Sequence, residues 1–228
     1  MEMNKGNQSS QAKMKVEVWS DIMCPFCYIG KRHYEQALQA FDGAGDVEVI
    51  WKSFQLDPEI PEEVEPGLTS AQYMASTKGI GSEQVEGMHH HVQAMARQAG
   101  LNYNLDETKV FNSFKAHRII QLAKDKGKGD EAEELFFKAH FTDNKDLGNP
   151  EVLRELGTSM GLSASEVDEA LSSPAYADKV RADIYEAQQV GVQGVPFFMF
   201  DEKYAVSGAQ PVATFQQALE KAYERWKA

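Results

Sequence analysis

"SDIMCPFCYIG", residues 20–30, contains both cysteines of the chain, Cys24 and Cys27, with two residues between them. The run "KVEVWS" (15–20) before it predicts a short buried strand. The segment "YIGKRHYEQALQAF" (28–41) after it has apolar residues at spacings of three and four, which predicts a helix. The cysteine pair is therefore expected where a strand is followed directly by a helix.

Three interpretations of the pair are open: a redox couple, half of a zinc site, or an inert pair. The free N–H groups and positive dipole end of a helix N-terminus favour a thiolate at Cys24, and a thiolate is the species that attacks a disulfide. Cys27, about one turn further along, is expected to reach the sulfur of Cys24. Structural zinc needs four ligands, and the sequence has no second Cys-x-x-Cys or His-x3–5-His motif. The redox couple is therefore favoured, with Pro25 suited to the first helical turn and Phe26 offering an apolar contact.

The remaining pattern predicts a sheet interrupted by a long helical segment. "VEVIWKSF" (47–54) predicts a second strand, and the succession strand, helix, strand implies a parallel pair. "VPFFMF" (195–200) and "YAVSG" (204–208) predict a hairpin, and 211–226 predicts a closing helix. Between these pieces the predicted helices are 70–79, 82–100, 108–127, 130–141, 149–161, 163–174 and 175–191.

Serine and glycine residues mark several of the predicted helix ends. Ser82 and Ser165 are candidate N-caps, because a serine hydroxyl accepts a hydrogen bond from a free N–H group of the first turn. Glycine tolerates the left-handed backbone that commonly ends a helix. The glycines in such positions are Gly79, Gly100, Gly127 and Gly161.

Charge and hydropathy exclude some classes of partner. The chain has 35 acidic and 23 basic residues, a net charge of -12, whereas nucleic acids and anionic membranes favour basic surfaces. No segment has the ~18 consecutive apolar residues that a membrane span needs. Residues 1–14 are polar and lack the apolar centre of a secretory signal. We therefore expect a disordered leader at 1–14, a cytoplasmic location, and neither nucleic acid nor membrane as a partner.

Val195–Pro196 opens the first strand of the predicted hairpin, within "GVQGVPFFMF" (191–200). A proline cannot donate a hydrogen bond to a sheet, so it belongs at the end or edge of a strand. The residues alone leave two possibilities open: an ordinary turn proline, or a cis peptide bond that turns the chain sharply.

Four segments together resemble the DsbA branch of the thioredoxin superfamily, and more narrowly its FrnE-like oxidoreductases. They are "SDIMCPFCYIGK", "NSFKAHRIIQLA", "LFFKAHFTDNKDLGNPEVL" and "GVQGVPFFMFDEKYAVSGAQP", and the likeness extends from about residue 15 to 225. The resemblance implies an α/β, thioredoxin-like fold with a large all-helical insertion domain. Residues 15–57 and 191–228 would form the thioredoxin-like domain, and 58–190 the insertion, as a helical cap over one side of the active site.

The resemblance also implies roles for the site residues. Cys24 would be the nucleophile and Cys27 the resolving cysteine. Pro196 would be cis and lie against the pair, with the backbone of Val195 holding a substrate strand by main-chain hydrogen bonds. The superfamily often has a buried acid six residues before the nucleophile, but this chain has Val18 there.

Three polar residues are candidates for a supporting role, and each has a structural alternative. Asp21, three residues before Cys24, would replace the missing acid or hold a loop. His117 and Arg118 would line the cleft, where Arg118 would favour a thiolate or a glutathione carboxylate, or they would be structural. The triplet His89–His91 is expected on a solvated helix face rather than at a metal, because successive helical side chains point about 100° apart. The nine methionines and the pair Phe136–Phe137 are expected to fill the core.

The leading hypothesis for function is a thiol–disulfide oxidoreductase, acting as a disulfide reductase or isomerase. It would cycle the CPFC pair through mixed disulfides with protein or glutathione disulfides. No metal or cofactor is expected, apart from glutathione as a co-substrate. The alternative is a glutathione-dependent isomerase or transferase of the kappa-class or hydroxychromene carboxylate isomerase type, although such enzymes typically lack the cysteine pair. A non-catalytic binding protein is a third possibility.

Overall fold

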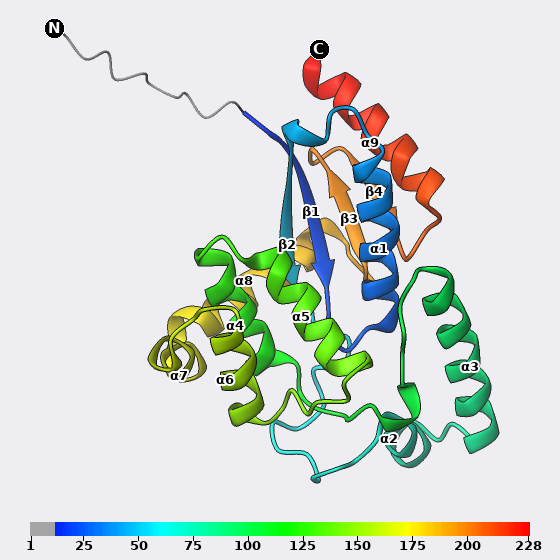
Figure 1. Ribbon diagram of the computed structural model, residues 1–228, viewed down its shortest axis with the longest axis vertical. Coiled ribbons are helices and arrows are strands. Elements are labelled where there is room, and N and C mark those ends of the chain that lie inside the picture. Colours follow the sequence, from blue (N-terminus) through cyan, green and yellow to red (C-terminus); the bar gives the residue numbers. More distant parts are fainter. Residues whose placement is uncertain (1–11) are drawn as a thin grey trace, which may run out of the picture.

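The computed structural model describes residues 12–228, and its centre is a four-stranded sheet in the order β2-β1-β3-β4 (Figure 1). β1 and β2 are parallel, and β3 is antiparallel to both β1 and β4, so the predicted strands and hairpin are confirmed. Most of the predicted leader 1–14 lies outside the described residues, and Met14 already belongs to β1. The strands are β1 (Met14–Ser20), β2 (Val47–Ser53), β3 (Phe197–Phe200) and β4 (Tyr204–Ser207).

Helices cover both faces of the sheet. Successive residues of β1 point to opposite sides, so each face has apolar side chains to be covered. Val18 packs with Tyr34 and Phe215 on one face, whereas Trp19 packs with Ala187 on the other. The first face is therefore covered by α1 and α9, and the second by α8. These three helices are α1 (Pro25–Gln39), α8 (Pro174–Val190) and α9 (Val212–Lys227).

The other helices form a block below the sheet in Figure 1. Phe136 and Phe137 are fully buried in the core of this block, as predicted. The same core continues into the first turns of α1, where the ring of Tyr28 stacks on Phe137 at 5.0 Å and on Tyr103 at 6.0 Å. The helices of the block are α2 (Ser70–Thr77), α3 (Ser82–Gln98), α4 (Phe114–Asp125), α5 (Gly129–Phe141), α6 (Pro150–Ser159) and α7 (Ala164–Ser172).

A buried lysine ties α1 to α5. Lys31 has only 1% of its side chain exposed and forms ion pairs with Glu35 of its own helix, with Asp130 at 3.1 Å and with Glu134 at 3.5 Å. Arg32 also pairs with Glu134. The helix that follows the cysteine loop is thus held by the sheet and by the helical block together. The predicted insertion domain, 58–190, includes α8, although α8 packs on the sheet. Its boundaries therefore stay a prediction.

The predicted helix ends are confirmed at the glycines but not at the serines. All four glycines have a positive φ just beyond the end of a helix: Gly79, Gly100, Gly127 and Gly161. The N-caps are Gly81 for α3 and Ser163 for α7, so the predictions of Ser82 and Ser165 were wrong. The Ser163 hydroxyl accepts from the N–H of Glu166.

The helix predicted at 108–127 begins only at Phe114. The N–H of Val110 donates to the carbonyl of Leu68 at 3.0 Å, and Thr69 and Lys109 form an isolated bridge. This pairing keeps the segment before α4 extended. Two short 3₁₀ turns complete the elements, at Ala44–Asp46 and Leu105–Glu107. Within residues 12–228, no helix combines the length and the apolar character needed to cross a membrane.

Candidate active site

Cys24 is the N-cap of α1, and Cys27 is the third residue of that helix. The backbone of Cys24 is extended, its N–H donates to the carbonyl of Asp21 at 2.8 Å, and its own carbonyl accepts from the N–H of Cys27 at 3.0 Å. Pro25 occupies the first helical turn, where a missing N–H costs nothing. Both cysteines are free thiols and are buried. The structure therefore agrees with the predicted position of the pair at a helix N-terminus.

Cys27 lies deeper than Cys24 and has no exposed surface. Burial raises the pKa of the Cys27 thiol well above its ordinary value, and the hydrogen bond and charge of Cys24 raise it further. The backbone of Asp21 and the side chain of Ser20 act in the opposite direction through hydrogen bonds. Because burial dominates, the Cys27 thiol holds its proton more tightly than an ordinary cysteine, and only its thiolate form could attack a disulfide.

The proline loop forms a second wall beside Cys24. The Val195–Pro196 peptide bond is cis, as the resemblance implies. The Cys24 thiol donates to the carbonyl oxygen of Val195 at 3.5 Å, and the carbonyl of Pro196 accepts from the N–H of Gly208 at 2.8 Å. The loop lies close to α1, because a Cβ atom added at Gly30 would be only 2.8 Å from Cγ of Pro196.

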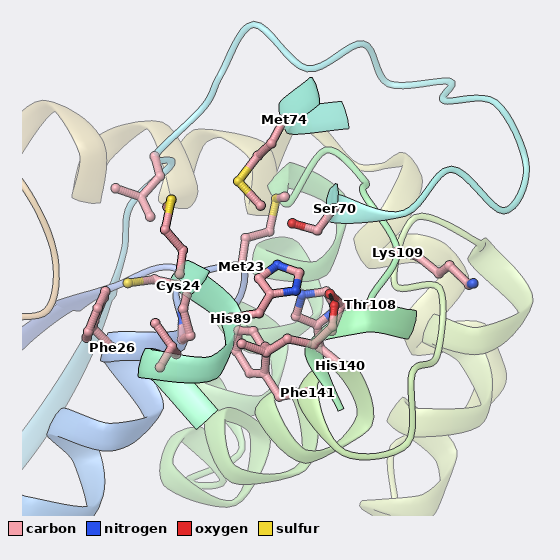
Figure 2. Close-up of a pocket in the computed structure, with 15 residues that line it drawn as sticks. Met23, Cys24, Phe26, Ser70, Met74, His89, Thr108, Lys109, His140 and Phe141 are labelled. Carbon is pink, nitrogen blue, oxygen red and sulfur yellow. Dashed lines mark hydrogen bonds between the residues drawn. The ribbon is translucent and has the colours of Figure 1, made fainter. Parts of the chain in front are cut away.

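An apolar pocket of about 330 Å³ opens beside Cys24, and Figure 2 shows the side chains around it. It lies between the cysteine loop, α2, α3 and the end of α5. Of the described residues that line it, only Lys109 carries a permanent charge, and Figure 2 shows Lys109 on the far side from Cys24. The apolar lining includes Met23, Phe26, Leu56, Met74, Met88 and Val92. Three of the methionines expected in the core therefore lie at the pocket instead.

A family model for the DSBA-like thioredoxin domain matches residues 15–220. The chain belongs to this family. A probable DsbA oxidoreductase from Streptomyces coelicolor is 40% identical, with a TM-score of 0.86 over 92% of this chain and 90% of that one. The narrower FrnE-like resemblance stays a prediction.

Two more distant structures share the fold of the DsbA-like chain. One is the cytosolic disulfide reductase DsbM from Pseudomonas aeruginosa, solved with GSH, which is 17% identical with a TM-score of 0.63 over 92% of this chain and 99% of that one. The other is a 2-hydroxychromene-2-carboxylate isomerase, 14% identical with a TM-score of 0.65 over 93% and 97%. These two neighbours support the thioredoxin-like fold with its helical insertion. The family match and the 40% identical DsbA oxidoreductase confirm an enzyme with disulfide oxidoreductase activity.

Asp21 holds the cysteine loop of this DsbA-like enzyme to a neighbouring segment. Its carboxylate oxygens accept hydrogen bonds from the N–H of Met23 at 3.2 Å and the N–H of Leu56 at 2.8 Å. Its side chain is buried, and one oxygen lies 3.4 Å from Nε2 of His117. The structure therefore shows the loop-holding contact that the sequence left as one alternative. A proton-transfer role stays a prediction.

His117 and Arg118 are neighbours in α4 but lie in different surroundings. His117 is fully buried beneath the cysteine loop, beside Asp21. Arg118 instead donates from Nη2 to the carbonyl of Ser173 at 2.6 Å, and it is not among the residues that line the pocket. The structure therefore shows for Arg118 the structural contact that the sequence left as one alternative.

The histidine triplet divides between surface and interior. His90 and His91 are exposed as expected, but His89 is buried, with Nδ1 2.9 Å from Oδ1 of Asp106, and it lines the pocket. The expectation of a wholly solvated face was therefore wrong for His89. His140 lines the same pocket, and burial lowers its pKa to about 4, partly offset by Asp21. Within residues 12–228, no group of three or more His, Cys, Asp or Glu is arranged to hold a metal.

Sequence reasoning missed two buried polar residues beneath the cysteines. Ser20 ends β1, and its hydroxyl donates to Oε2 of Glu133 in α5 at 3.5 Å. Glu133 has 1% of its surface exposed. A signal was present in the sequence, because Glu133 precedes Phe136, Phe137 and His140 by three, four and seven positions, which places a carboxylate on the apolar face of the helix.

Proposed function

We propose that this DsbA-like enzyme reduces or isomerises disulfides by cycling the Cys24–Cys27 pair between dithiol and disulfide. The observation that carries the proposal is the position of Cys24. Its sulfur lies at a helix N-terminus, beside the carbonyl of Val195 and at the edge of an apolar pocket. That position offers electrostatic support for a thiolate and a surface on which a substrate can lie.

The reaction has two exchange steps. The Cys24 thiolate attacks one sulfur of the substrate disulfide, a Cys24–substrate bond forms, and the other substrate sulfur leaves with the electron pair and takes a proton. The Cys27 thiolate then attacks Sγ of Cys24, which releases the first sulfur of the substrate as a second thiolate. The substrate gains two electrons and two protons, and the enzyme becomes a Cys24–Cys27 disulfide.

A protein segment beside its disulfide is the substrate that fits the pocket best. The lining of methionines with Phe26 and Leu56 suits apolar side chains, and methionine adapts its shape to varied partners. The main chain of Val195 would align an extended substrate, as a strand edge does. Glutathione would restore the dithiol, with two molecules oxidised to one glutathione disulfide for each turnover. The fold shared with the cytosolic DsbM supports a cytoplasmic location.

Insulin reduction and trapping test the proposal together. The wild-type enzyme should reduce insulin with glutathione or dithiothreitol as electron donor. The Cys27→Ser variant should accumulate a mixed disulfide with a peptide disulfide, because the second exchange step is blocked. Cys24→Ser is the matched control and should trap nothing. Absence of both insulin reduction and trapping would contradict the proposal.

A glutathione-dependent isomerase is the second candidate, favoured by the fold shared with 2-hydroxychromene-2-carboxylate isomerase. Such an activity does not need a resolving cysteine. It predicts tight binding of glutathione and turnover of a chromene substrate that survives Cys27→Ala. The position of Cys27 against Cys24 favours disulfide exchange instead.

A further inference from the structure

The second exchange step requires a proton acceptor close to Cys27. The side chain of Cys27 has no exposed surface, so bulk water does not reach the sulfur in this structure. Its carbonyl and thiol neighbours are poor bases. A group inside the protein must therefore accept the proton when Cys27 becomes a thiolate.

A buried path leads from Cys27 to a carboxyl group. Ser20 lies close enough to Cys27 for its side chain to lower the pKa of that thiol through a hydrogen bond. The Ser20 hydroxyl also donates to Oε2 of Glu133 at 3.5 Å. Ser20 and Glu133 have 0% and 1% of their surfaces exposed. Ser20 comes from the strand that precedes the cysteine loop and Glu133 from the helical block, so the path crosses between the two parts of the enzyme.

We propose that Glu133, acting through the hydroxyl of Ser20, accepts the proton of Cys27 in the second exchange step and returns it when the pair is reduced again. This inference rests on the disulfide exchange proposed above. Ser20 gives its own proton to Glu133 and takes the proton of Cys27. The Cys27 sulfur then attacks Sγ of Cys24, the Cys24–substrate bond breaks, and the substrate thiolate leaves with the electron pair. No further oxidant or reductant is needed.

The surroundings of Glu133 leave it able both to accept and to return a proton near neutral pH. Burial raises its pKa to about 7. His117 and Lys124 of α4 and Lys31 of α1 lower it, whereas Asp130 of the same helix raises it. An acid with a pKa near the working pH is the most effective proton carrier, because both of its forms are populated.

The other buried acid near the pair is already engaged. Asp21 accepts hydrogen bonds from the backbone of Met23 and Leu56, and it faces His117. Protonation of Asp21 would weaken both loop contacts at each turnover. For Glu133, in contrast, Ser20 is the one hydrogen-bond donor found within residues 12–228, so its carboxyl group gains a proton at less structural cost.

Stopped-flow reaction of the reduced enzyme with one equivalent of 5,5′-dithiobis(2-nitrobenzoate) separates the two steps. The first thionitrobenzoate leaves when Cys24 attacks, and the second leaves when Cys27 resolves the mixed disulfide. In the wild type the rate of the second phase should rise with pH through about 7. Glu133→Gln should slow this phase at least about tenfold at pH 7.5 and remove its inflection near pH 7, with the first phase unchanged.

Three further variants make the test specific. Ser20→Ala should show the same loss although the carboxyl group is present, and Glu133→Asp should keep a pH-dependent second phase at a reduced rate. Glu131→Gln, on the exposed face of α5, is the matched control and should behave as the wild type. Circular dichroism at each pH checks that every variant is folded.

The outcomes separate this inference from the proposed function. Two wild-type phases with an identical second-phase profile in Glu133→Gln would overturn the role of Glu133 and leave disulfide exchange intact. A wild-type profile in Ser20→Ala would overturn the relay. If the wild type releases no second thionitrobenzoate, the exchange by Cys27 fails first, and the role of Glu133 fails with it.

Discussion

The sulfur of Cys24 lies 3.5 Å from the carbonyl oxygen of Val195, although 171 positions separate the two residues in the chain. The contact places the proposed nucleophile against the backbone of the half-buried Val195. A substrate that lies along this backbone would present its disulfide to Cys24. The geometry of the proline loop should therefore control the reactivity of Cys24. That geometry depends on Gly30, which lies against Pro196.

Gly30→Ala should lower both stability and activity. The added methyl group would lie 2.8 Å from Cγ of Pro196, so the proline loop or α1 must shift. Overpacking of this kind costs about 1–3 kcal/mol, which exceeds the ~1 kcal/mol that alanine gains over glycine within a helix. Urea unfolding and insulin reduction measure the two effects.

Gly87→Ala is the matched control for that substitution. Gly87 lies inside α3, and an added Cβ there would meet nothing within 4 Å. It should be neutral or stabilise the enzyme by roughly 0.5–1 kcal/mol, with unchanged insulin reduction. Equal effects of the two alanines would contradict the proposed close contact with Pro196.

Asp21→Ala should destabilise the enzyme by roughly 2–4 kcal/mol. The change leaves the partly buried N–H groups of Met23 and Leu56 without their acceptors, and each lost hydrogen bond costs about 1–2 kcal/mol because water replaces the carboxylate only in part. Asp21→Asn keeps one acceptor oxygen and should lose about half as much. Chemical denaturation of both variants measures the difference, and a stable Asp21→Ala enzyme would contradict the loop-holding role.

Glu133→Gln should gain stability relative to the wild type as pH rises from 4.5 to about 7. The folded-state pKa of Glu133 is raised to about 7 from an ordinary 4.5, so in this window the folded enzyme binds a proton that the unfolded chain has lost. Stability conferred by the protonated group is thus lost as pH rises, by up to about 3 kcal/mol. Unfolding curves of both proteins at pH 5 and pH 8 test the prediction, and a pH-independent difference contradicts it.

His140→Phe should show the opposite pH dependence. The folded-state pKa of His140 is lowered to about 4 from 6.5, so the unfolded chain gains a proton first as pH falls. The free energy of unfolding of the wild type then falls by up to about 3 kcal/mol between pH 6.5 and 4, and that of the variant does not. Thermal melts across this range should show the variant gaining on the wild type, and parallel curves would exclude the effect.

Met88→Glu should lower kcat/KM about tenfold for a peptide whose disulfide adjoins an apolar residue. Met88 is 44% exposed at the pocket, so the carboxylate should not disturb folding, but it introduces a charge where the substrate would bury apolar surface. For a peptide with polar neighbours the loss should be small. Equal losses for both peptides would mean that the pocket does not bind the substrate.

Local patterns in the sequence predicted the strands, most helices and the cysteine loop, because each depends on residues a few positions apart. Pro25 at the first helical turn and the positive φ of Gly127 are of this kind. The cis bond at Pro196 came only from the resemblance, since a proline at a strand end is compatible with either isomer. These features position the redox pair.

Contacts across the fold were beyond the reach of such patterns. The burial of His89 depends on Asp106 and on the pocket that α2, α3 and α5 enclose. The sequence left open whether His117 and Arg118 line the cleft or are structural, and one step along a helix rotates a side chain by about 100°, so the two neighbours have different surroundings. Glu133 reaches Ser20 only because α5 packs beneath the cysteine loop.

The pairing of β1 with β3 brings together two strands that stand on either side of the helical block in the chain. A ribosome makes both cysteines early, and the whole helical block follows before Val195 and Pro196 emerge. A nascent or truncated chain can therefore carry both thiols but lacks the backbone wall beside Cys24. If the pair works as proposed, competence for exchange therefore waits until β3 has been made, after the whole helical block.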